Sequence, residues 1–237
     1  MRHRRELRVD GPGETLEDVA AALSRCRICA EGPFEARLPH EPNPIYQVST
    51  TARLCIASQA AGTRAHASSL PFDDASGDRL RAWLDLGRQD FYDAERVAIV
   101  PMGFCFPGQD AAGGDLPPRR ECAPAWRARL FATLPQIELI LAIGQYAQAW
   151  HLGAERRANL TATVVAWREI HGSARQPRII PLPHPSWRNS GWLKRNPWFE
   201  AELLPAVRSE VRRLVNDTPP TQTRSDLRAL SPAVQNR

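Results

Sequence analysis

Four short apolar runs recur along the chain at wide intervals and predict buried strands. They cover residues 54–57, 97–101, 139–144 and 178–183. Each run is nearly continuous in apolar side chains, as strands are when helices cover both faces of a parallel sheet. Helix-like patterns separate the runs at residues 77–85, 119–133 and 146–152. This alternation predicts an α/β protein, a three-layer α/β/α sandwich with a central four-stranded, mainly parallel sheet.

Two further helices and two polar ends complete the predicted organisation. Leu16, Val19 and Leu23 lie at helical intervals after a polar start, and a last helix is expected from Pro197 to about residue 215. Residues 32–49 are rich in proline and polar residues and are interpreted as a loop. We therefore expect a mobile segment at residues 1–13, one domain at residues 14–215 and a disordered tail at residues 216–237.

The composition fits one domain that binds a charged partner. A chain of 237 residues with 43% hydrophobic residues can bury one sizeable core. No apolar run approaches the length of a membrane span, so we expect a cytoplasmic protein, and nothing demands more than a monomer. The net charge of +5 comes mainly from arginine. Arginine binds phosphate well, but a GC-rich genome would also favour it, so the charge permits nucleic acid without proving it.

One stretch with candidate chemistry follows the first predicted strand. The strand ends in SQAAG at residues 58–62, whose small side chains leave backbone amides free at the carboxyl edge of the sheet. Open α/β sheets bind ligands at this edge. The chain continues through PFDD at residues 71–74 to SGD at residues 76–78, which is typical of a turn before a helix start. Such a loop suits a flat ligand that lies against the backbone.

A second candidate loop follows the fourth predicted strand. His184 lies between Pro183 and Pro185, and the two prolines hold it on a stiff turn. The turn comes at the same edge of the sheet as the first loop, so we expect His184 to lie near residues 59–66. The alternative is a histidine that only forms a hydrogen bond within its own turn.

Four of the five cysteines are spaced as ligands of a metal or cluster. Cys26 and Cys29 form a CxxC pair at the end of the first helix, and Cys105 and Cys122 follow the second strand. An odd number of cysteines without a secretion signal argues against a disulfide framework. Four thiolates can hold zinc or a four-iron cluster, and the spacing alone does not decide between them. Cys55 lies inside the first strand and is interpreted as a small buried hydrophobic residue.

Together these motifs resemble the uracil-DNA glycosylase superfamily, in its iron–sulfur-containing family 4 and family 5 branches. The resemblance rests on the first loop with FDDASGDRL at residues 72–80, on the HPS motif at residues 184–186 and on the cysteine spacing. It implies base excision repair, in which the N-glycosidic bond of uracil or another deaminated base in DNA is hydrolysed on a flipped nucleotide. It also implies a [4Fe-4S] cluster on the four cysteines, with zinc as the alternative, and a DNA partner at the nucleoid.

The resemblance also implies roles for individual residues. His184 would donate a hydrogen bond to the base oxygen on which negative charge gathers, and Phe72 would stack on the base. A carboxylate near the sugar would stabilise positive charge and orient water. Asp74 is the first choice and Asp73 the second, although either could simply cap the following helix. His66 is a further catalytic candidate or an ordinary surface histidine.

Two departures from the family pattern leave the substrate open. Gln59 stands where family 4 has a glutamate, and Pro101 stands where family 4 reads uracil with an asparagine. Gln59, Gly62 and Ser186 are the other expected substrate contacts, and small residues in the first loop would admit a larger purine. A DNA-binding member with lost or altered chemistry is therefore the alternative. A zinc-stabilised protein that never touches DNA is a third possibility.

Three residues after the HPS histidine are the expected DNA contacts. Trp187 could fill the space left by a flipped nucleotide, Arg188 could hold phosphate, and Asn189 is the third expected contact. Further phosphate candidates, each also readable as an ordinary surface charge, are Arg119, Arg120, Lys194 and Arg195.

Overall fold

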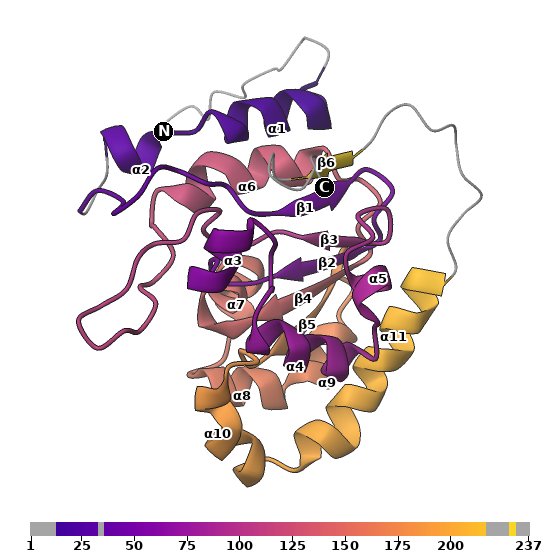
Figure 1. Ribbon diagram of the computed structural model, residues 1–237. Helices are drawn as coiled ribbons and strands as arrows, with labels where there is room; N and C mark the ends of the chain where they lie inside the picture. The colour runs from indigo at the N-terminus through magenta and orange to yellow at the C-terminus, as the bar shows by residue number, and fades with distance from the viewer. Residues whose placement is uncertain (1–12, 33–35, 217–227, 231–237) are drawn as a thin grey trace, which may run out of the picture.

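The centre of the protein is a mixed, mostly parallel sheet. The computed structural model describes residues 13–32, 36–216 and 228–230, and within them the strand order is β5-β4-β2-β3-β1-β6 (Figure 1). The strands are β1 (Gln47–Ser49), β2 (Leu54–Ala57), β3 (Val97–Ile99), β4 (Leu139–Ile143), β5 (Arg178–Leu182) and β6 (Arg228–Leu230). β2, β3, β4 and β5 pair in parallel, whereas β1 pairs antiparallel with β3 and β6. The four parallel strands therefore end at one edge of the sheet.

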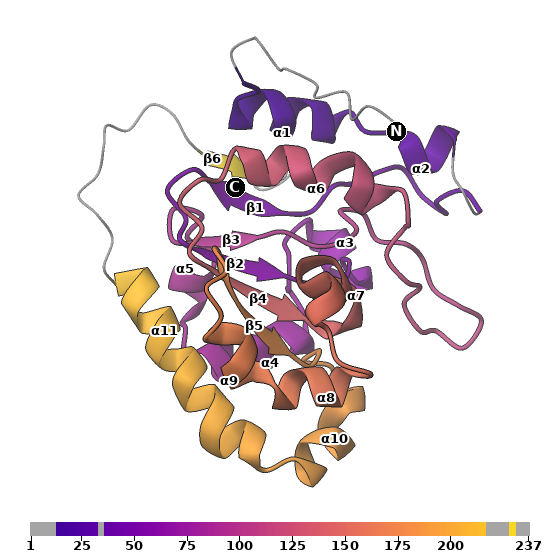
Figure 2. The same cartoon turned by 180° about the vertical axis from the view of Figure 1, so that it is seen from behind.

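Helices cover both faces of this sheet. They are α1 (Leu16–Ser24), α2 (Ile28–Glu31), α3 (Thr63–Ser68), α4 (Ala75–Leu84), α5 (Arg88–Phe91), α6 (Cys122–Ala132), α7 (Gly144–Leu152), α8 (Leu160–Val165), α9 (Trp167–His171), α10 (Ser190–Arg195) and α11 (Leu204–Asn216). Two 3-10 turns, η1 (Gly153–Glu155) and η2 (Trp187–Asn189), and a π-helical turn, η3 (Phe199–Leu203), join them. α4 and α5 lie in front of the sheet in Figure 1, and α6 and α7 lie in front of it in Figure 2.

Alternate residues of each parallel strand enter two separate cores. In β2, Cys55 and Ala57 pack in the core formed with α1, α6 and α7, whereas Leu54 and Ile56 pack in the core formed with α4 and α11. All four residues of β2 have no exposed surface. Burial on both faces explains why these strands are continuous apolar runs in the sequence.

The predicted four-stranded sheet is incomplete, because β1 lies within the segment that was interpreted as a loop. Gln47 and Ser49 are polar, and both are buried in this strand. The Gln47 side chain donates hydrogen bonds to the carbonyl oxygens of Phe91 and Val97, at 3.1 and 2.7 Å, which satisfies its amide inside the protein. A strand of three residues, two of them polar, contains no apolar run, so the hydrophobic pattern does not predict it.

The long predicted helices are present, and most residues of the predicted chain ends lie outside the described part of the chain. The long helices are found within a few residues of their expected positions, but α3, α5, α8, α9 and α10 are short and were not predicted. The amino-terminal segment lies outside the described residues except residue 13, and of the carboxyl-terminal tail the structure describes residue 216 and β6. Among the described residues, no helix combines the length and apolar character that crossing a membrane requires.

Candidate active site

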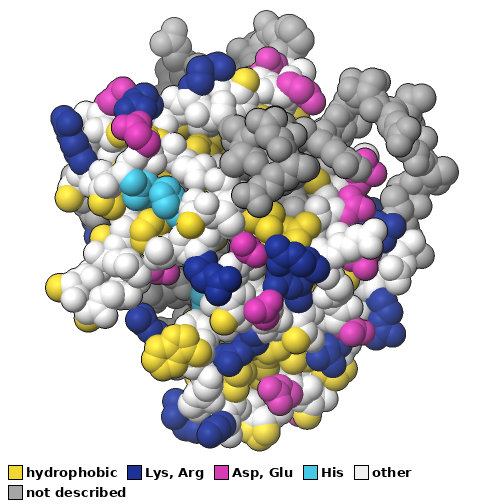
Figure 3. Space-filling view, in the orientation of Figure 1, with side chains coloured by type: hydrophobic (Ala, Val, Ile, Leu, Met, Phe, Trp, Pro, Cys, Tyr) yellow, Lys and Arg dark blue, Asp and Glu magenta, His cyan; other side chains and the backbone are white. Residues whose placement is uncertain are grey.

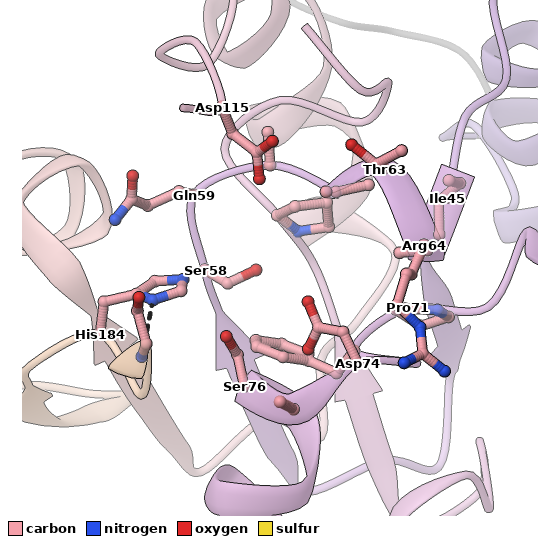
Figure 4. Close-up of a pocket in the computed structure, with 18 of the residues that line it drawn as sticks. Ile45, Ser58, Gln59, Thr63, Arg64, Pro71, Asp74, Ser76, Asp115 and His184 are labelled. Carbon is pink, nitrogen blue, oxygen red and sulfur yellow. Dashed lines mark hydrogen bonds between the residues drawn. The ribbon is translucent and has the colours of Figure 1, made fainter. Parts of the chain in front are cut away.

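A pocket of about 590 Å³ opens at the carboxyl ends of the parallel strands (Figure 4). The loops after β2, β3 and β5 line it, together with the start of α4. Of the predicted site residues, it brings together Gln59, Gly62, Phe72, Asp74, His184, Ser186, Trp187, Arg188 and Asn189. The position agrees with the general location of ligand sites in open α/β sheets.

His184 presents one ring nitrogen to this pocket. Its Nδ1 accepts a hydrogen bond from the backbone N–H of Ser186, at 3.2 Å, so a neutral ring carries its proton on Nε2. Asn189 donates its side-chain amide to the His184 carbonyl oxygen, at 2.7 Å, and fixes the loop. Burial lowers the pKa of His184 below 6.5, although the nearby Asp74 carboxylate acts in the opposite direction. At neutral pH the ring is therefore a neutral donor, and Figure 4 shows its Nε2 side facing the pocket.

Asp74 has two functions at once. Its Oδ1 accepts the backbone N–H of Gly77, at 2.8 Å, and so caps the amino terminus of α4. Its second oxygen, Oδ2, lies on the side of Gly62, 3.8 Å from the point where a Cβ on that glycine would stand. The capping role considered from the sequence is therefore present, and it leaves one carboxylate oxygen for the pocket.

Phe72 is held by an unusually close turn. Its backbone φ is +57°, a conformation that costs energy for a residue other than glycine. A Cβ on Gly77 would stand only 1.8 Å from the Phe72 carbonyl oxygen, so the turn closes only around a glycine. The Tyr92 hydroxyl donates to that same carbonyl, at 3.2 Å. These contacts place the Phe72 ring at the pocket, edge-on against Phe91 with 6.2 Å between ring centroids.

Gln59 packs over the beginning of α7. Its Nε2 lies 2.9 Å from the point where a Cβ on Gly144 would stand, and Gly144 has a φ of +77°. The carboxamide offers the pocket both a donor and an acceptor. Pro101, which follows β3, also lines the pocket and offers no N–H or polar side chain. Polar recognition on this wall therefore depends on Gln59 and on backbone groups.

Asp73 and His66 do not line the pocket. Asp73 forms an ion pair with Arg88, at 3.1 Å. Burial tends to raise the pKa of Asp73, but hydrogen bonds from Arg88 and Ser68 outweigh it and the pKa is lowered. His66 contacts His40, with 4.0 Å between ring centroids and an interplanar angle of 39°, and burial lowers the pKa of His66. The structure thus separates both residues from the group formed by His184 and Asp74.

Asp115 lines the pocket and was not predicted from the sequence. It lies on the connection between β3 and α6, opposite Asp74 in Figure 4. Burial raises the pKa of Asp115, and the charge of Asp74 adds to this effect. Between Cys105 and Cys122 the sequence shows only a spacer with glycine, proline and charged residues, so no motif distinguishes this aspartate.

The rim of the pocket carries an exposed tryptophan among basic side chains. Trp187 is 73% exposed, and the Arg188 guanidinium lies 5.9 Å from the centre of its ring. Arg79 of α4 donates to the Ser186 carbonyl oxygen, at 2.9 Å, and so ties this loop to the start of α4. In Figure 3 Lys and Arg side chains border the hollow on this face. A projecting aromatic ring between cations is suited to contact nucleic acid.

The four predicted cysteine ligands surround a second, small cavity of about 20 Å³. They are Cys26, Cys29, Cys105 and Cys122. Cys55 is fully buried inside β2, as expected. No three His, Cys, Asp or Glu side chains within the described ranges are arranged as a site for a metal ion. The structure therefore gathers the four cysteines around one space without converging them on one point.

Two N–H groups donate hydrogen bonds to the sulfurs of these cysteines, whereas burial disfavours their ionisation in the absence of a bound group. The Phe104 backbone N–H and the Trp126 indole N–H donate to the sulfurs of Cys122 and Cys26, both at 3.3 Å. Burial raises the pKa of the Cys29 thiol to about 11 and that of Cys105 to about 12, so free thiols are protonated at neutral pH. Binding of a metal or cluster would remove these protons. The donor set thus fits the expected group chemically.

A buried arginine supports the strand end beneath the pocket. Arg127 of α6 has no exposed surface, and it donates to the carbonyl oxygens of Val100 and Pro101, at 2.9 and 2.8 Å. Its other nitrogen lies 2.5 Å from Nε2 of His151. Burial lowers the pKa of His151 to about 3, so the neutral ring accepts this bond. The sequence indicates none of these contacts, because the partners lie 24 to 27 residues away.

Comparison with known families agrees with this geometry. The family model of the uracil DNA glycosylase superfamily matches residues 45–208, which is well over half of the chain. The matched region contains β1 to β5, the pocket loops and the HPS motif, and it excludes Cys26 and Cys29. Family membership suggests DNA glycosylase activity on a DNA substrate. The chain belongs to the uracil-DNA glycosylase superfamily.

Proposed function

We propose that this protein is a DNA glycosylase of base excision repair, which hydrolyses the N-glycosidic bond of uracil or another deaminated base. One observation carries the proposal. A neutral His184, with its proton on Nε2, and the free oxygen Oδ2 of Asp74 face the same pocket at the carboxyl edge of the sheet. This pairs a donor for a developing anion with a carboxylate for a developing cation, which is what cleavage of this bond requires.

The base must leave the duplex to reach this pocket. Inside the stack the sugar carbon and the base edge are inaccessible, so the nucleotide has to be flipped out. The cavity of about 590 Å³ offers room for a flipped base with its sugar at the mouth. Phe72 lies at the pocket and would stack on the base, and Trp187 on the rim would fill the space left in the duplex.

The bond would break by separation of charge. The electron pair of the bond between C1′ and the base nitrogen leaves with the base, and positive charge develops on the sugar. His184 donates a hydrogen bond from Nε2 to the base oxygen as negative charge gathers there. Asp74 stabilises the sugar cation through Oδ2. A water oxygen then bonds to C1′, and its proton passes to Asp74 or to solvent.

Base selection would rest on Gln59 rather than on the wall formed by Pro101. The Gln59 carboxamide can donate to one base group and accept from another, as the edge of uracil or hypoxanthine requires. Gly62 and the alanines beside it leave space for a purine. We therefore propose deaminated bases as the substrate class. The family 4 or family 5 assignment is proposed on the motifs of the first loop.

We also infer that the four gathered cysteines hold a [4Fe-4S] cluster, with zinc as the alternative. The donor set is four sulfurs, and two N–H groups already donate to them. The group would join the CxxC segment to the connection between β3 and α6 and stabilise the fold. It would supply no step of the hydrolysis.

The cluster proposal is tested by metal and sulfide analysis of the purified protein. Cys26→Ser is expected to lose iron, acid-labile sulfide and visible absorption, and to unfold at a lower temperature. Cys55→Ser is the matched control, because Cys55 is buried in β2 outside the small cavity. It should keep its full iron content. Stoichiometric zinc without sulfide in the wild type would replace the cluster by the alternative.

The activity is tested by single-turnover excision from matched oligonucleotides that contain uracil, hypoxanthine or xanthine. We expect one of these bases to be released, and His184→Ala to slow release by about 10²- to 10³-fold, as for loss of one donor to a developing anion. Arg129→Ala, a surface substitution on α6, is the control. No release from any oligonucleotide, with duplex binding intact, would support the alternative of a DNA-binding member with altered chemistry.

A further inference from the structure

The geometry points to Asp115 as a second carboxylate of the reaction site, which acts with Asp74 to stabilise positive charge on the sugar. The inference rests on the proposed function, because the cation exists only if the glycosidic bond is cleaved. It adds a residue from the connection between β3 and α6 to the residues contributed by the loops after β2 and β5. Three observations and one electrostatic argument carry it.

First, the backbone holds Asp115 in place. A short hairpin spans residues 108–116, and its two sides pair through a bridge between Gln109 and Asp115. The backbone N–H of Leu116 donates to Gly108, at 2.9 Å, and that of Asp110 donates to Gly114, at 2.8 Å. The pairing of this hairpin places the Asp115 carboxylate at the pocket.

Second, Asp115 and Asp74 approach the same point from opposite sides. A Cβ on Gly62 would stand 3.0 Å from Oδ2 of Asp115 and 3.8 Å from Oδ2 of Asp74. Figure 4 shows the two carboxylates directed toward the middle of the pocket. Because Gly62 has no side chain, both carboxylate oxygens can approach its backbone closely at the wall of the pocket. A sugar at the mouth of the pocket would lie between two negative charges.

Third, the charges around Asp115 leave it short of positive partners. Gln109 donates from Nε2 to Oδ1 at 3.4 Å, and Asp110 adds negative charge from the same hairpin. Asp74 faces it from the start of α4, and Arg188 is the cation that faces it from η2. The pKa of Asp115 is raised by burial first, while Gln109 and Arg188 act in the opposite direction. Two facing carboxylates repel each other, and a cation between them relieves that repulsion.

Fourth, bound DNA would strengthen these charges. In the free protein Asp115 is exposed as a residue, so water still reaches its partly buried carboxylate and screens it in part. A duplex lying on the rim would cover the mouth and expel that water. Each carboxylate would then act on the sugar through a medium of lower effective dielectric constant. At about 5 Å and an effective dielectric constant of about 25 to 50, loss of one charge corresponds to a rate decrease of about 10- to 100-fold.

Substitution by asparagine removes this charge and little else. Asp115→Asn keeps the size of the side chain and an oxygen that can accept from Gln109. The matched control is Asp110→Asn, which makes the same change in net charge on the same hairpin. The Asp110 carboxylate accepts from the backbone N–H groups of Ala112 and Gly114, at 2.9 and 2.8 Å, and lies outside the pocket lining. Both variants should keep the wild-type melting temperature to within a few degrees.

The charge-specific test is binding to two duplexes with abasic analogues. One carries a pyrrolidine ring, which is positively charged at neutral pH, and the other carries a neutral tetrahydrofuran ring. The wild type and Asp110→Asn are expected to bind the cationic duplex more tightly. Asp115→Asn should lose about 10-fold or more of that preference and keep its affinity for the neutral duplex. An unchanged preference in Asp115→Asn would overturn the inference.

The kinetic test is the pH profile of single-turnover excision. Asp115→Asn should slow excision by about 10- to 100-fold. Its rate should also persist to lower pH than that of the wild type, because the group with the raised pKa is gone. Asp115→Glu should recover part of the rate. Normal excision by Asp115→Asn would refute the inference alone, whereas no excision by the wild type together with equal binding of both analogues would refute the proposed function as well.

Discussion

Gly77→Ala is the substitution for which the structure makes the strongest prediction. The added methyl group would stand 1.8 Å from the Phe72 carbonyl oxygen, 2.7 Å from its carbonyl carbon and 2.8 Å from its Cβ. Non-bonded atoms prefer separations of about 3.5 Å or more, so the backbone of Phe72 has to retreat by more than about 1 Å. The Tyr92 hydroxyl and the Asp74 cap both hold that turn in place.

The expected loss of stability follows from opposing contributions. Alanine gains up to about 1 kcal/mol over glycine in a helix. Against this, overpacking costs about 1 to 3 kcal/mol, and weakening of the Asp74 cap costs about 0.5 to 2 kcal/mol. We therefore expect a net destabilisation of about 0.5 to 4 kcal/mol. Because Phe72 and Asp74 belong to the reaction site, a displacement of about 1 Å should also slow excision by about 10²-fold.

Urea unfolding and single-turnover excision measure the two effects. Gly87→Ala is the control, since the nearest atom to its added methyl group would lie 3.9 Å away and its backbone is in an ordinary conformation. That variant should change the free energy of unfolding by less than about 0.5 kcal/mol and leave excision unchanged. If Gly77→Ala behaved like Gly87→Ala in both assays, the tight turn around Phe72 would not organise the site as described.

Three further predictions concern the core and the rim. Arg127→Met should destabilise the fold by about 3 to 5 kcal/mol in urea, because two buried carbonyl groups lose their donor, whereas Arg129→Met on the same helix should cost about 0 to 1 kcal/mol. As the pH falls from 6.5 to about 3, the free energy of unfolding should decrease by up to about 1.4 kcal/mol per pH unit. The reason is that His151 takes up a proton in the unfolded chain but stays neutral in the folded protein. His151→Gln should therefore reduce this pH dependence of the free energy of unfolding. Trp187→Ala should weaken duplex binding and slow excision with no change in the melting temperature. A fluorescence titration measures the binding and a thermal scan the melting temperature. Equal binding by the variant and the wild type would contradict the role of Trp187 on the rim.

The features that were predictable from the sequence are those that depend on residues close together in the chain. β2 is fully buried on both faces, and its continuous apolar run shows this directly. His184 follows β5 between two prolines, so its place at the sheet edge follows from topology and turn chemistry. The small residues at 58–62 line the pocket after β2, and Asp74 caps α4 close to the expected helix start. In each case the information lies within about ten residues of the feature.

The features that were missed depend on partners distant in the sequence. β1 is concealed because Gln47 is polar, and only its bonds to carbonyls 44 and 50 residues away make its burial tolerable. Asp115 looks like any loop aspartate until the hairpin brings it to Gly62. Arg127 looks like a surface charge on a helix, yet it is fully buried. Tertiary contacts determine the burial and role of these residues, and local propensity does not predict them.

Product analysis by mass spectrometry tests the central claim most directly. A duplex oligonucleotide with a single uracil or hypoxanthine is incubated with excess protein, and both the strand and the small-molecule fraction are weighed. Hydrolysis predicts free base together with a strand that has lost the base and gained the elements of water. In His184→Ala this product should form far more slowly. An intact strand with the wild type bound to it would contradict the account.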